Sequence, residues 1–519
     1  MELGKHLINL GKATLHPPRR VEDDDDAFAA GAPWVLLDLE AYVADHRNAT
    51  TAYSHSESGK EIQVTFFLAR PPRVSYFCVF CPGRDHTEIA IEPKILAVEE
   101  NLVLLCIVVS PEKEIYRDRD FFIYQANGAD NEGPLLHRLP RPPGRCFFDY
   151  SKVGLLRCNE DYCAGGSSVL RPHRVSKDEF IIAALCGMSE PGVGCQFTDE
   201  DFMPGPGDFA LLVYNSKLGS WSAKVVSLDQ QQLQKQPLDC FLHFNSKVIT
   251  IGGDAGTMGF VDLWRGILLC DVLKGSAKLS YVPLPKPILS DNELMGDARL
   301  SRDIAFIEGC IKYVELQIIF NPSLFRNCRY ANDGWIARRY SRPVAAADSV
   351  AAVNSSEDDW GVECEIESSD HINIVNNPHF KLLPRPHDNK GQPLPPFKSL
   401  VTCHPTLSLK GNDDDTVYFM NKIVPGDNKA WVMAVDMRTK ELLGVAQFAA
   451  ERTRAVTFAY VHSRISKYLT GASGTKGSLK RPGHMLMRYP SKLPSTLLAL
   501  RNFLEHGSDQ EDRDDMMLD

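Results

Sequence analysis

From Trp34 onward the chain consists of short apolar runs separated by proline, glycine, asparagine or aspartate. Examples are WVLLDLEAYV, IQVTFFLA, VSYFCVFC and ILAVEENLVLLCIVV. Short runs bounded by such residues are typical of strands joined by turns. Stretches with a helical period are hard to find before the C-terminal end, which argues against alternating strands and helices and so against a nucleotide-binding parallel sheet.

Four segments repeat one pattern, in which an apolar strand ends in a polar residue and is followed by a turn and a second strand. The segments begin at Phe121, Phe209, Gly266 and Ala430, and their polar residues are Gln125, Asn215, Asp271 and Asp436. The pattern predicts β-hairpins whose Asn or Asp side chains accept hydrogen bonds from the turn. KVITIGGDAGTMGFVDLWRGI, FIEGCIKYVELQI and DWGVECEIESS are weaker candidates for further strands, with turns at Arg265-Gly266 and Gly309.

The spacing of this repeat predicts an all-β, mainly antiparallel fold of the β-propeller type. The four polar residues lie 90, 56 and 165 positions apart, and the last interval is close to three steps of about 55 residues. Blades of a propeller repeat at roughly 40–50 residues and are lengthened by loops, and their ring protects the sheet edges. Trp221, Trp264 and Trp431 flank the predicted turns and strands, so we expect them to be largely buried between blades.

The composition along the chain predicts four regions. Residues 1–32 form an acidic leader without fixed structure, because adjacent like charges resist compaction. Residues 33–493 form the propeller-like domain, with exposed loops such as 383–398. Residues 494–507 carry the start, the apolar spacing and the stop of a short helix. Residues 508–519 form a disordered acidic tail.

Composition and charge narrow the class of protein. The 519 residues are 44% hydrophobic and 24% charged, which is enough for a packed core. The net charge of −10 opposes general attraction to nucleic acid or anionic membranes, and the longest apolar run, 95–109, is too short to span a bilayer. The 14 cysteines are too sparse for a disulfide scaffold and indicate reduced thiols in the cytoplasm or nucleus. The basic start of the chain leaves import into an organelle open.

No motif predicts a catalytic set, a cofactor or a metal site. Cys78 and Cys81 form a CxxC, but structural zinc needs four ligands and no second pair exists. The glutamates of 363–367 share one strand face, and 413–415 is an acidic run; both are interpreted as hydrated surface rather than as calcium ligands. The SxxK at 473–476 lacks the elements that accompany it in serine enzymes.

One segment, 452–492, is strongly basic, with nine basic residues, three tyrosines and no acid. Interleaved basic and aromatic residues suit nucleic-acid binding, although the acidic tail that follows makes this partner unlikely. A protein-docking or nuclear-import segment is a second alternative, and simple hydrated surface is the favoured one. The candidate interaction residues are Lys467, Lys476, Lys480, Arg481 and Arg488.

Several long strings resemble a known family. They include ARPPRVSYFCVFCPG, HFNSKVITIGGDAGTMGFVDLWRGILLCDVL, SRDIAFIEGCIKYVELQI and AWVMAVDMRTKELLGVAQFAAERT. The chain is similar over about 34–453 to the plant domain-of-unknown-function family 1618, which implies a plant protein and transfers no catalytic residue. Its organisation is also similar to F-box-associated propeller proteins, but the N-terminal segment lacks a helical F-box, which weakens a ligase-adaptor role.

These observations favour a non-enzymatic module that binds other proteins, because propeller faces gather loops from every blade on one surface. The main alternative is an enzyme, such as a hydrolase, with a site in the central channel, where distant strands converge without a linear motif. Nucleic-acid binding through 452–492 is a third alternative.

Overall fold

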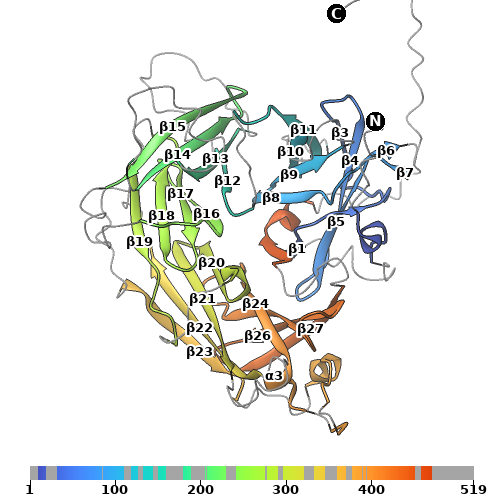
Figure 1. The fold of residues 1–519 in the computed structure, drawn as a ribbon, viewed down its shortest axis with the longest axis vertical. Coiled ribbons are helices and arrows are strands. Elements are labelled where there is room, and N and C mark those ends of the chain that lie inside the picture. Colours follow the sequence, from blue (N-terminus) through green and yellow to red (C-terminus); the bar gives the residue numbers. More distant parts are fainter. Residues whose placement is uncertain are drawn as a thin grey trace, which may run out of the picture. The chain divides into compact units, whose positions relative to one another are not determined.

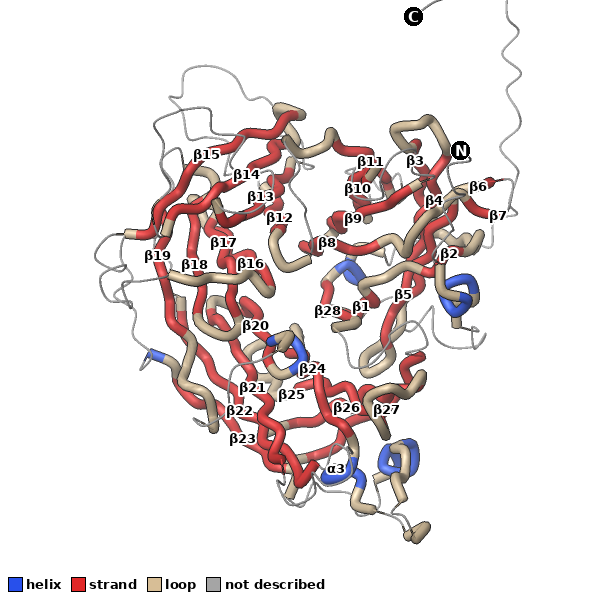
Figure 2. The backbone as a smooth tube through the Cα atoms, viewed as in Figure 1, coloured by secondary structure: helices blue, strands red, loops and turns tan. Residues whose placement is uncertain are grey.

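The computed structural model describes residues 10–18, 32–83, 86–109, 118–126, 133–143, 150–158, 179–188, 205, 207–229, 241–274, 278–289, 296–320, 332–344, 359–369, 377–387, 390–392, 394–449 and 458–469. Within these residues, five four-stranded antiparallel units follow one another along the chain, and a sixth sheet combines strands from both ends of the described region (Figure 1 and Figure 2).

The five units each use four consecutive strands. The first two are β8 (Lys94–Glu99), β9 (Leu102–Val108), β10 (Arg119–Gln125) and β11 (Leu135–Leu139), then β12 (Val153–Arg157), β13 (Phe180–Gly187), β14 (Asp208–Asn215) and β15 (Ser220–Leu228). The next two are β16 (Lys247–Gly252), β17 (Thr257–Asp262), β18 (Gly266–Asp271) and β19 (Lys278–Pro283), then β20 (Arg302–Ile307), β21 (Cys310–Phe320), β22 (Asn332–Pro343) and β23 (Gly361–Glu367). The fifth is β24 (Val401–Leu407), β25 (Thr416–Lys422), β26 (Lys429–Asp436) and β27 (Glu441–Ala449). A short parallel pairing of β15 with β19 joins the outer edges of two units.

The sixth sheet, here called the closing sheet, pairs the last described strand with the first. Its order is β28 (Tyr460–Ser463), β1 (Val35–Asp38), β5 (Val74–Phe80), β4 (Glu61–Phe67) and β3 (Ala52–His55), and β2 (Tyr42–Val43) pairs with β5. A two-stranded sheet, β6 (Pro82–Gly83) and β7 (His86–Thr87), follows β5. The helices are short: η1 (Lys12–Leu15), η4 (Ala298–Leu300), η7 (Pro378–Leu382), α3 (Pro396–Ser399) and η8 (Ile465–Lys467).

The sheets form a closed ring. The first strand of each unit contacts the first strand of the next, in the order β8, β12, β16, β20, β24 and β28. β28 then pairs with β1, so that Val35 lies opposite Ser463. The backbone N–H groups of Ile95 and Ala41 donate to the carbonyls of Leu39 (2.9 Å) and Pro93 (2.8 Å), which joins the closing sheet to β8. The predicted all-β, propeller-like fold is therefore confirmed.

Apolar clusters fill the space between neighbouring sheets, so both faces of most strands are buried. In β9, Leu105 packs in one cluster with Phe77 of the closing sheet, whereas the adjacent Leu104 packs in another with Leu155 of β12. Successive side chains of a strand point to opposite faces. A strand that lies between two apolar clusters therefore has apolar residues at successive positions, which explains the short continuous apolar runs of the sequence.

All four predicted hairpins are present, as β10–β11, β14–β15, β18–β19 and β26–β27. Asn215 Oδ1 accepts from the backbone of Lys217 (2.9 Å) and Leu218 (3.2 Å), as predicted for its turn. Asp271 instead binds the Thr257 hydroxyl (2.7 Å) and the Lys274 ammonium (2.8 Å). In this turn the Lys274 ammonium occupies the Asp271 carboxylate in place of the backbone N–H donors.

The predicted count of steps between the last two hairpins was wrong. The interval of 165 residues was interpreted as three steps, but only the unit β20–β23 lies between β18–β19 and β26–β27, which makes two steps. Long connections, such as 344–360 between β22 and β23, lengthen each step.

Part of the predicted leader has a fixed structure. Within 10–18, Thr14 of η1 is buried, and Gly11 N and Thr14 Oγ1 donate to the Glu92 carboxylate at 3.1 and 3.0 Å. The prediction of disorder therefore does not hold for this stretch. The predicted helix 494–507 and the acidic tail 508–519 lie outside the described residues.

The three tryptophans are half-buried rather than fully enclosed. Trp221, Trp264 and Trp431 each pack against the apolar cluster beside their own sheet. The predicted loop 383–398 is mostly exposed, but Leu383 and Phe397 are buried in the core. None of the helices in the described part of the chain has the length and apolar composition needed to cross a membrane.

Candidate functional site

A pocket of about 530 Å³ lies between the inner strands of the ring. Its walls come from β8, β12, β16, β20 and the segment 462–468. Glu308 and Gly253, in the turns that follow β20 and β16, are exposed, whereas Lys247 at the start of β16 is buried. The pocket is therefore open where the inner strands end and closed where they begin.

A cluster of three charged or polar side chains forms the closed end, and each comes from a different sheet. Lys247 Nζ lies 2.6 Å from Asp303 Oδ1 of β20 and 3.3 Å from His462 Nε2 of β28. Asp303 Oδ2 also accepts from the backbone N–H of Leu407 at 3.0 Å. His462 Nδ1 lies 3.3 Å from the Leu407 carbonyl, which only a protonated Nδ1 can approach as a donor.

These contacts give each of the three side chains a hydrogen-bond partner. His462 is neutral, since burial and the neighbouring Lys247 ammonium lower the pKa of His462 to about 3. Burial opposes the ionisation of Asp303, but the charge of Lys247 and the hydrogen bonds from Lys247 and the Leu407 backbone N–H together hold the pKa of Asp303 below its ordinary value. Within the described residues, both nitrogens of His462 face Lys247 and Leu407 rather than a hydroxyl or thiol. The cluster therefore connects sheets across the channel and does not form a nucleophile with its base.

Acidic side chains line the open end. Glu100 sits in the β8–β9 turn with a φ of 47°, and its carboxylate accepts from the Tyr468 hydroxyl (2.6 Å) and lies 3.8 Å from the Arg464 guanidinium. Its neighbour Glu99 is half-buried beside Thr250. Burial, together with the charge of Glu100, raises the pKa of Glu99 to about 8 despite the opposing effect of Arg464. Glu99 is thus mostly protonated at neutral pH.

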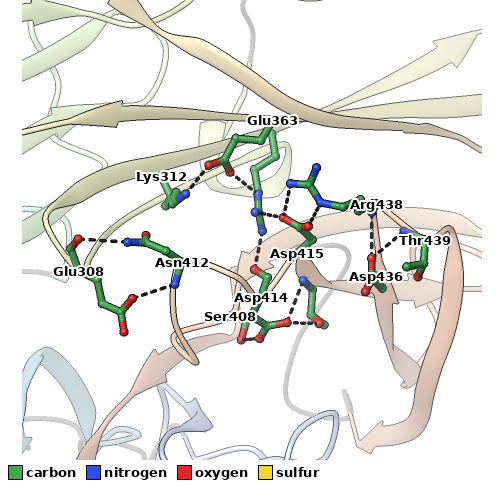
Figure 3. A network of polar contacts seen from close by, with 12 residues as sticks. Glu308, Lys312, Glu363, Ser408, Asn412, Asp414, Asp415, Asp436, Arg438 and Thr439 are labelled. Atoms are coloured by element: carbon green, nitrogen blue, oxygen red, sulfur yellow. Dashed lines mark hydrogen bonds and ion pairs between the residues drawn. The ribbon is translucent and has the colours of Figure 1, made fainter.

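A second polar network joins the sheets β20–β23 and β24–β27 (Figure 3). Arg339 of β22 donates to Glu363 of β23 (2.7 Å), to the Asp414 carbonyl (2.7 Å) and to the Asp415 carboxylate. Glu363 also accepts from Lys312, and Asp415 from Arg438.

The prediction of hydrated surface was wrong for two members of this network. Asp415 is buried and held by two arginines, and Glu363 pairs with two basic side chains, because strands from two sheets meet there. Asp415 connects the two sheets through Arg339, and Glu363 holds Arg339 within its own sheet. Within the described residues, no group of three or more His, Cys, Asp or Glu side chains is placed to hold a metal ion.

The structure describes one of the five predicted interaction residues. Lys467 is exposed at the end of η8. The other four, Lys476, Lys480, Arg481 and Arg488, lie outside the described residues, as does the whole SxxK at 473–476. Cys78 and Cys81 are both buried, and burial raises the pKa of Cys81 to about 11, so its thiol is protonated at neutral pH.

Sequence reasoning did not single out the pocket residues, because no two of the strands that carry them are adjacent in the sequence. A signal was nevertheless present. Lys247 and Asp303 stand at the start of the apolar strands KVITIG and RDIAFI, His462 lies within YVHS, and Glu99 and Glu100 interrupt the longest apolar run. A charged residue in such a strand must find a partner inside the fold.

The closed ring of antiparallel sheets defines a propeller-like, all-β protein. The family model described as "Protein of unknown function (DUF1618)" matches residues 260–418, from β17 to β25. Residues 260–418 are thus similar to the DUF1618 family, as the resemblance to family 1618 predicted. No curated protein matches the chain.

The solved structures that match the chain share little sequence with it. Hydrazine synthase from Kuenenia stuttgartiensis is 10% identical with a TM-score of 0.28, over 74% of this chain and 76% of that one. The WD40 domain of SCAP from fission yeast is 12% identical with a TM-score of 0.26, over 80% and 86%. A polysaccharide lyase of family PL25, an ulvan lyase, is 9% identical with a TM-score of 0.28, over 79% and 77%. Likenesses at this level support no inference about activity, ligand or partner.

Proposed function

We propose that the protein is a non-enzymatic binding protein whose propeller channel holds a small polar ligand. The pocket carries this proposal. Its volume of about 530 Å³ falls within the roughly 300–1,000 Å³ of small-molecule sites. Polar side chains from separate sheets converge on it, and the cluster of Lys247, Asp303 and His462 fixes its closed end. A site built on rigid strands and already satisfied internally is preorganised for binding.

A thermal-shift screen with a pocket-filling variant tests this function. The panel contains small amines, polyols and carboxylates, and at least one compound is expected to raise the melting temperature. Val98→Trp fills part of the pocket that Val98 lines and should abolish the shift. Val362→Trp is the matched control, because Val362 is 59% exposed on β23 and does not line the pocket. A panel without effect, or a shift that survives in Val98→Trp, overturns the proposal.

Protein binding is a second candidate, favoured by the segment that precedes β16. Leu242 and Phe244 point outward and are 50% and 63% exposed. The alternate residues anchor the segment: Phe241 packs edge-on against Tyr281 (5.5 Å), and Asn245 donates to the Leu185 carbonyl (2.8 Å). A rigid segment that presents two apolar side chains suits an apolar patch on a partner protein.

Comparative affinity capture tests this second candidate. The double variant Leu242→Ser, Phe244→Ser should lose a partner that the parent chain retains. Leu218→Ser, at the exposed tip of the β14–β15 turn, should retain it. Equal recovery by the parent and both variants would exclude the segment as a docking site. The nucleic-acid alternative rests on 452–492 and stays a prediction.

A further inference from the structure

We propose that the ligand of the channel pocket carries a single protonated amine, which pairs with the carboxyl group of Glu99. This inference rests on the proposed function and names the chemical class of the ligand. It follows from the charges that line the pocket, taken one group at a time.

Two of the three basic residues that line the pocket, Lys247 and Arg464, already face acids. Lys247 is held by Asp303 at 2.6 Å and is buried with it. The Arg464 guanidinium lies 3.8 Å from Glu100. An anionic ligand would have to compete with these carboxylates for the same cations, and it would pass Glu99, Glu100 and Glu308 at the entrance.

The acids along the pocket also have partners, with one exception. Glu100 accepts from the Tyr468 hydroxyl at 2.6 Å, and Glu308 accepts from the backbone N–H of Asn412 at 3.0 Å. Glu99 lines the pocket, and in the described part of the chain it forms no ion pair. The Thr250 hydroxyl beside it already donates to the Leu155 carbonyl at 2.7 Å. A protonated Glu99 can donate to Thr250, whereas an ionised Glu99 shares Arg464 with Glu100 and would gain from a further cation.

A ligand ammonium supplies that cation. It would also lower the repulsion between Glu99 and Glu100, which lie next to each other in the chain. A second ammonium deeper in the pocket would meet the Lys247 ammonium, so the geometry favours one amine at the open end and neutral polar groups beyond it. The titratable and charged groups around Glu99 are Glu100, Arg464 and Tyr468, and those elsewhere along the pocket are Arg157, Glu308, Tyr150, Lys247 and His462.

Binding of an amine should release the proton of Glu99, which distinguishes pairing with Glu99 from simple packing in the pocket. At pH 7 the free protein holds a proton on Glu99, because the pKa of Glu99 is about 8. Pairing with an ammonium favours the carboxylate, so close to one proton is released for each amine bound. Below pH 8 the affinity should rise about tenfold per pH unit, and it should level off above pH 8.

Calorimetry on the full chain tests the inference with three probes of one shape: aminocyclohexanol, cyclohexanediol and hydroxycyclohexanecarboxylate. Titrations at pH 7 in two buffers with different heats of ionisation give the number of protons released. The amine is expected to bind at least tenfold more tightly than the diol, and to release close to one proton. Glu99→Gln should reduce its affinity to that of the diol and abolish the release. Glu365→Gln removes an acid of β23 that is paired with Arg338. It should change neither the affinity for the amine nor the release of the proton.

The outcomes separate this inference from the proposed function. If the diol or the carboxylate binds best and Val98→Trp abolishes that binding, the pocket is a binding site but the amine inference is wrong. If the amine binds to the parent chain without releasing a proton, Glu99 is not its partner, whatever the stability of Glu99→Gln. If the pocket-filling variant has no effect on any ligand, both proposals fail.

Discussion

Glu99 imposes a cost on the fold whenever its carboxyl group is ionised. Its pKa in the folded protein is about 8, well above the ordinary value. Between about pH 4.5 and 8 the folded state therefore holds a proton that the unfolded chain has lost, and stability falls as the pH rises through this window. We expect Glu99→Gln to remove this decline.

The measurement is the free energy of unfolding in urea at pH 5, 7 and 8.5 without ligand. The advantage of Glu99→Gln over the parent chain should grow with pH and level off above pH 8. Glu365→Gln, an acid with a basic partner at the surface, provides the comparison. A constant difference across the three pH values would mean that Glu99 is ionised throughout.

His462 affects the pH dependence of stability in the opposite direction. The pKa of His462 is about 3 in the folded protein and near 6.5 when unfolded, so the unfolded state binds more protons in between. Stability is thus lost as the pH falls from about 6.5 towards 3. His462→Gln should lose less stability in this range, while His55→Gln, at an exposed position of β3, should behave like the parent chain. Acid unfolding followed by circular dichroism shows the difference. His404 and His243, whose pKa values burial lowers to about 4, and acids with lowered pKa values such as Asp303 contribute to the remaining sensitivity.

At the level of elements, we expect very different losses of stability when one or the other of two adjacent arginines of β22 is replaced. Arg339 is buried and bridges the half-buried Glu363 and the buried Asp415, so Arg339→Met breaks the buried pair with Asp415 and leaves the two acids with Lys312 and Arg438 alone. Breaking a buried pair in this way costs about 3–5 kcal/mol. Arg338→Met removes a partly exposed pair with Glu365, which is worth about 0–1 kcal/mol. Urea unfolding of both variants checks the contrast, and equal losses would show that the contacts of Arg339 with Glu363 and Asp415 do not stabilise the fold.

Elements with local signals could be predicted from the sequence. The four hairpins were found because each joins two apolar runs through a short polar turn, and Gly309, with a φ of 82°, marks the β20–β21 turn. The hairpin β22–β23 was not found as a unit, since a connection of 17 residues, 344–360, separates its strands. The burial of Asp415 was missed for a related reason, because its partner Arg339 lies 76 positions away in another sheet.

At the level of the whole molecule, the closure and the pocket depend on contacts that no local pattern encodes. β1 and β28 pair although more than 400 residues separate them, and each short strand resembles many others in the chain. The pocket needs this closure, because His462, Ser463 and Arg464 line it at the end of β28. The spacing of the hairpin repeat predicted a ring of sheets, while the position and chemistry of the site followed only from the three-dimensional arrangement.

The ring is closed by the pairing of β28 with β1. Weakening β28 should therefore loosen all the sheets of the ring and not the closing sheet alone. Tyr460 of β28 is fully buried, stacks on His404 at 4.3 Å and packs edge-on against Phe448 at 5.7 Å. Tyr460→Ala leaves a cavity and should cost about 3–5 kcal/mol. Hydrogen exchange followed by mass spectrometry is expected to accelerate in the inner strands β8, β16 and β24 as well as in β28, because opening the ring exposes the apolar clusters between all sheets. Tyr53→Ala, which removes a half-exposed ring from β3 of the same sheet, should leave exchange in those strands unchanged. Acceleration confined to 458–469 would show instead that the sheets hold together without their closure.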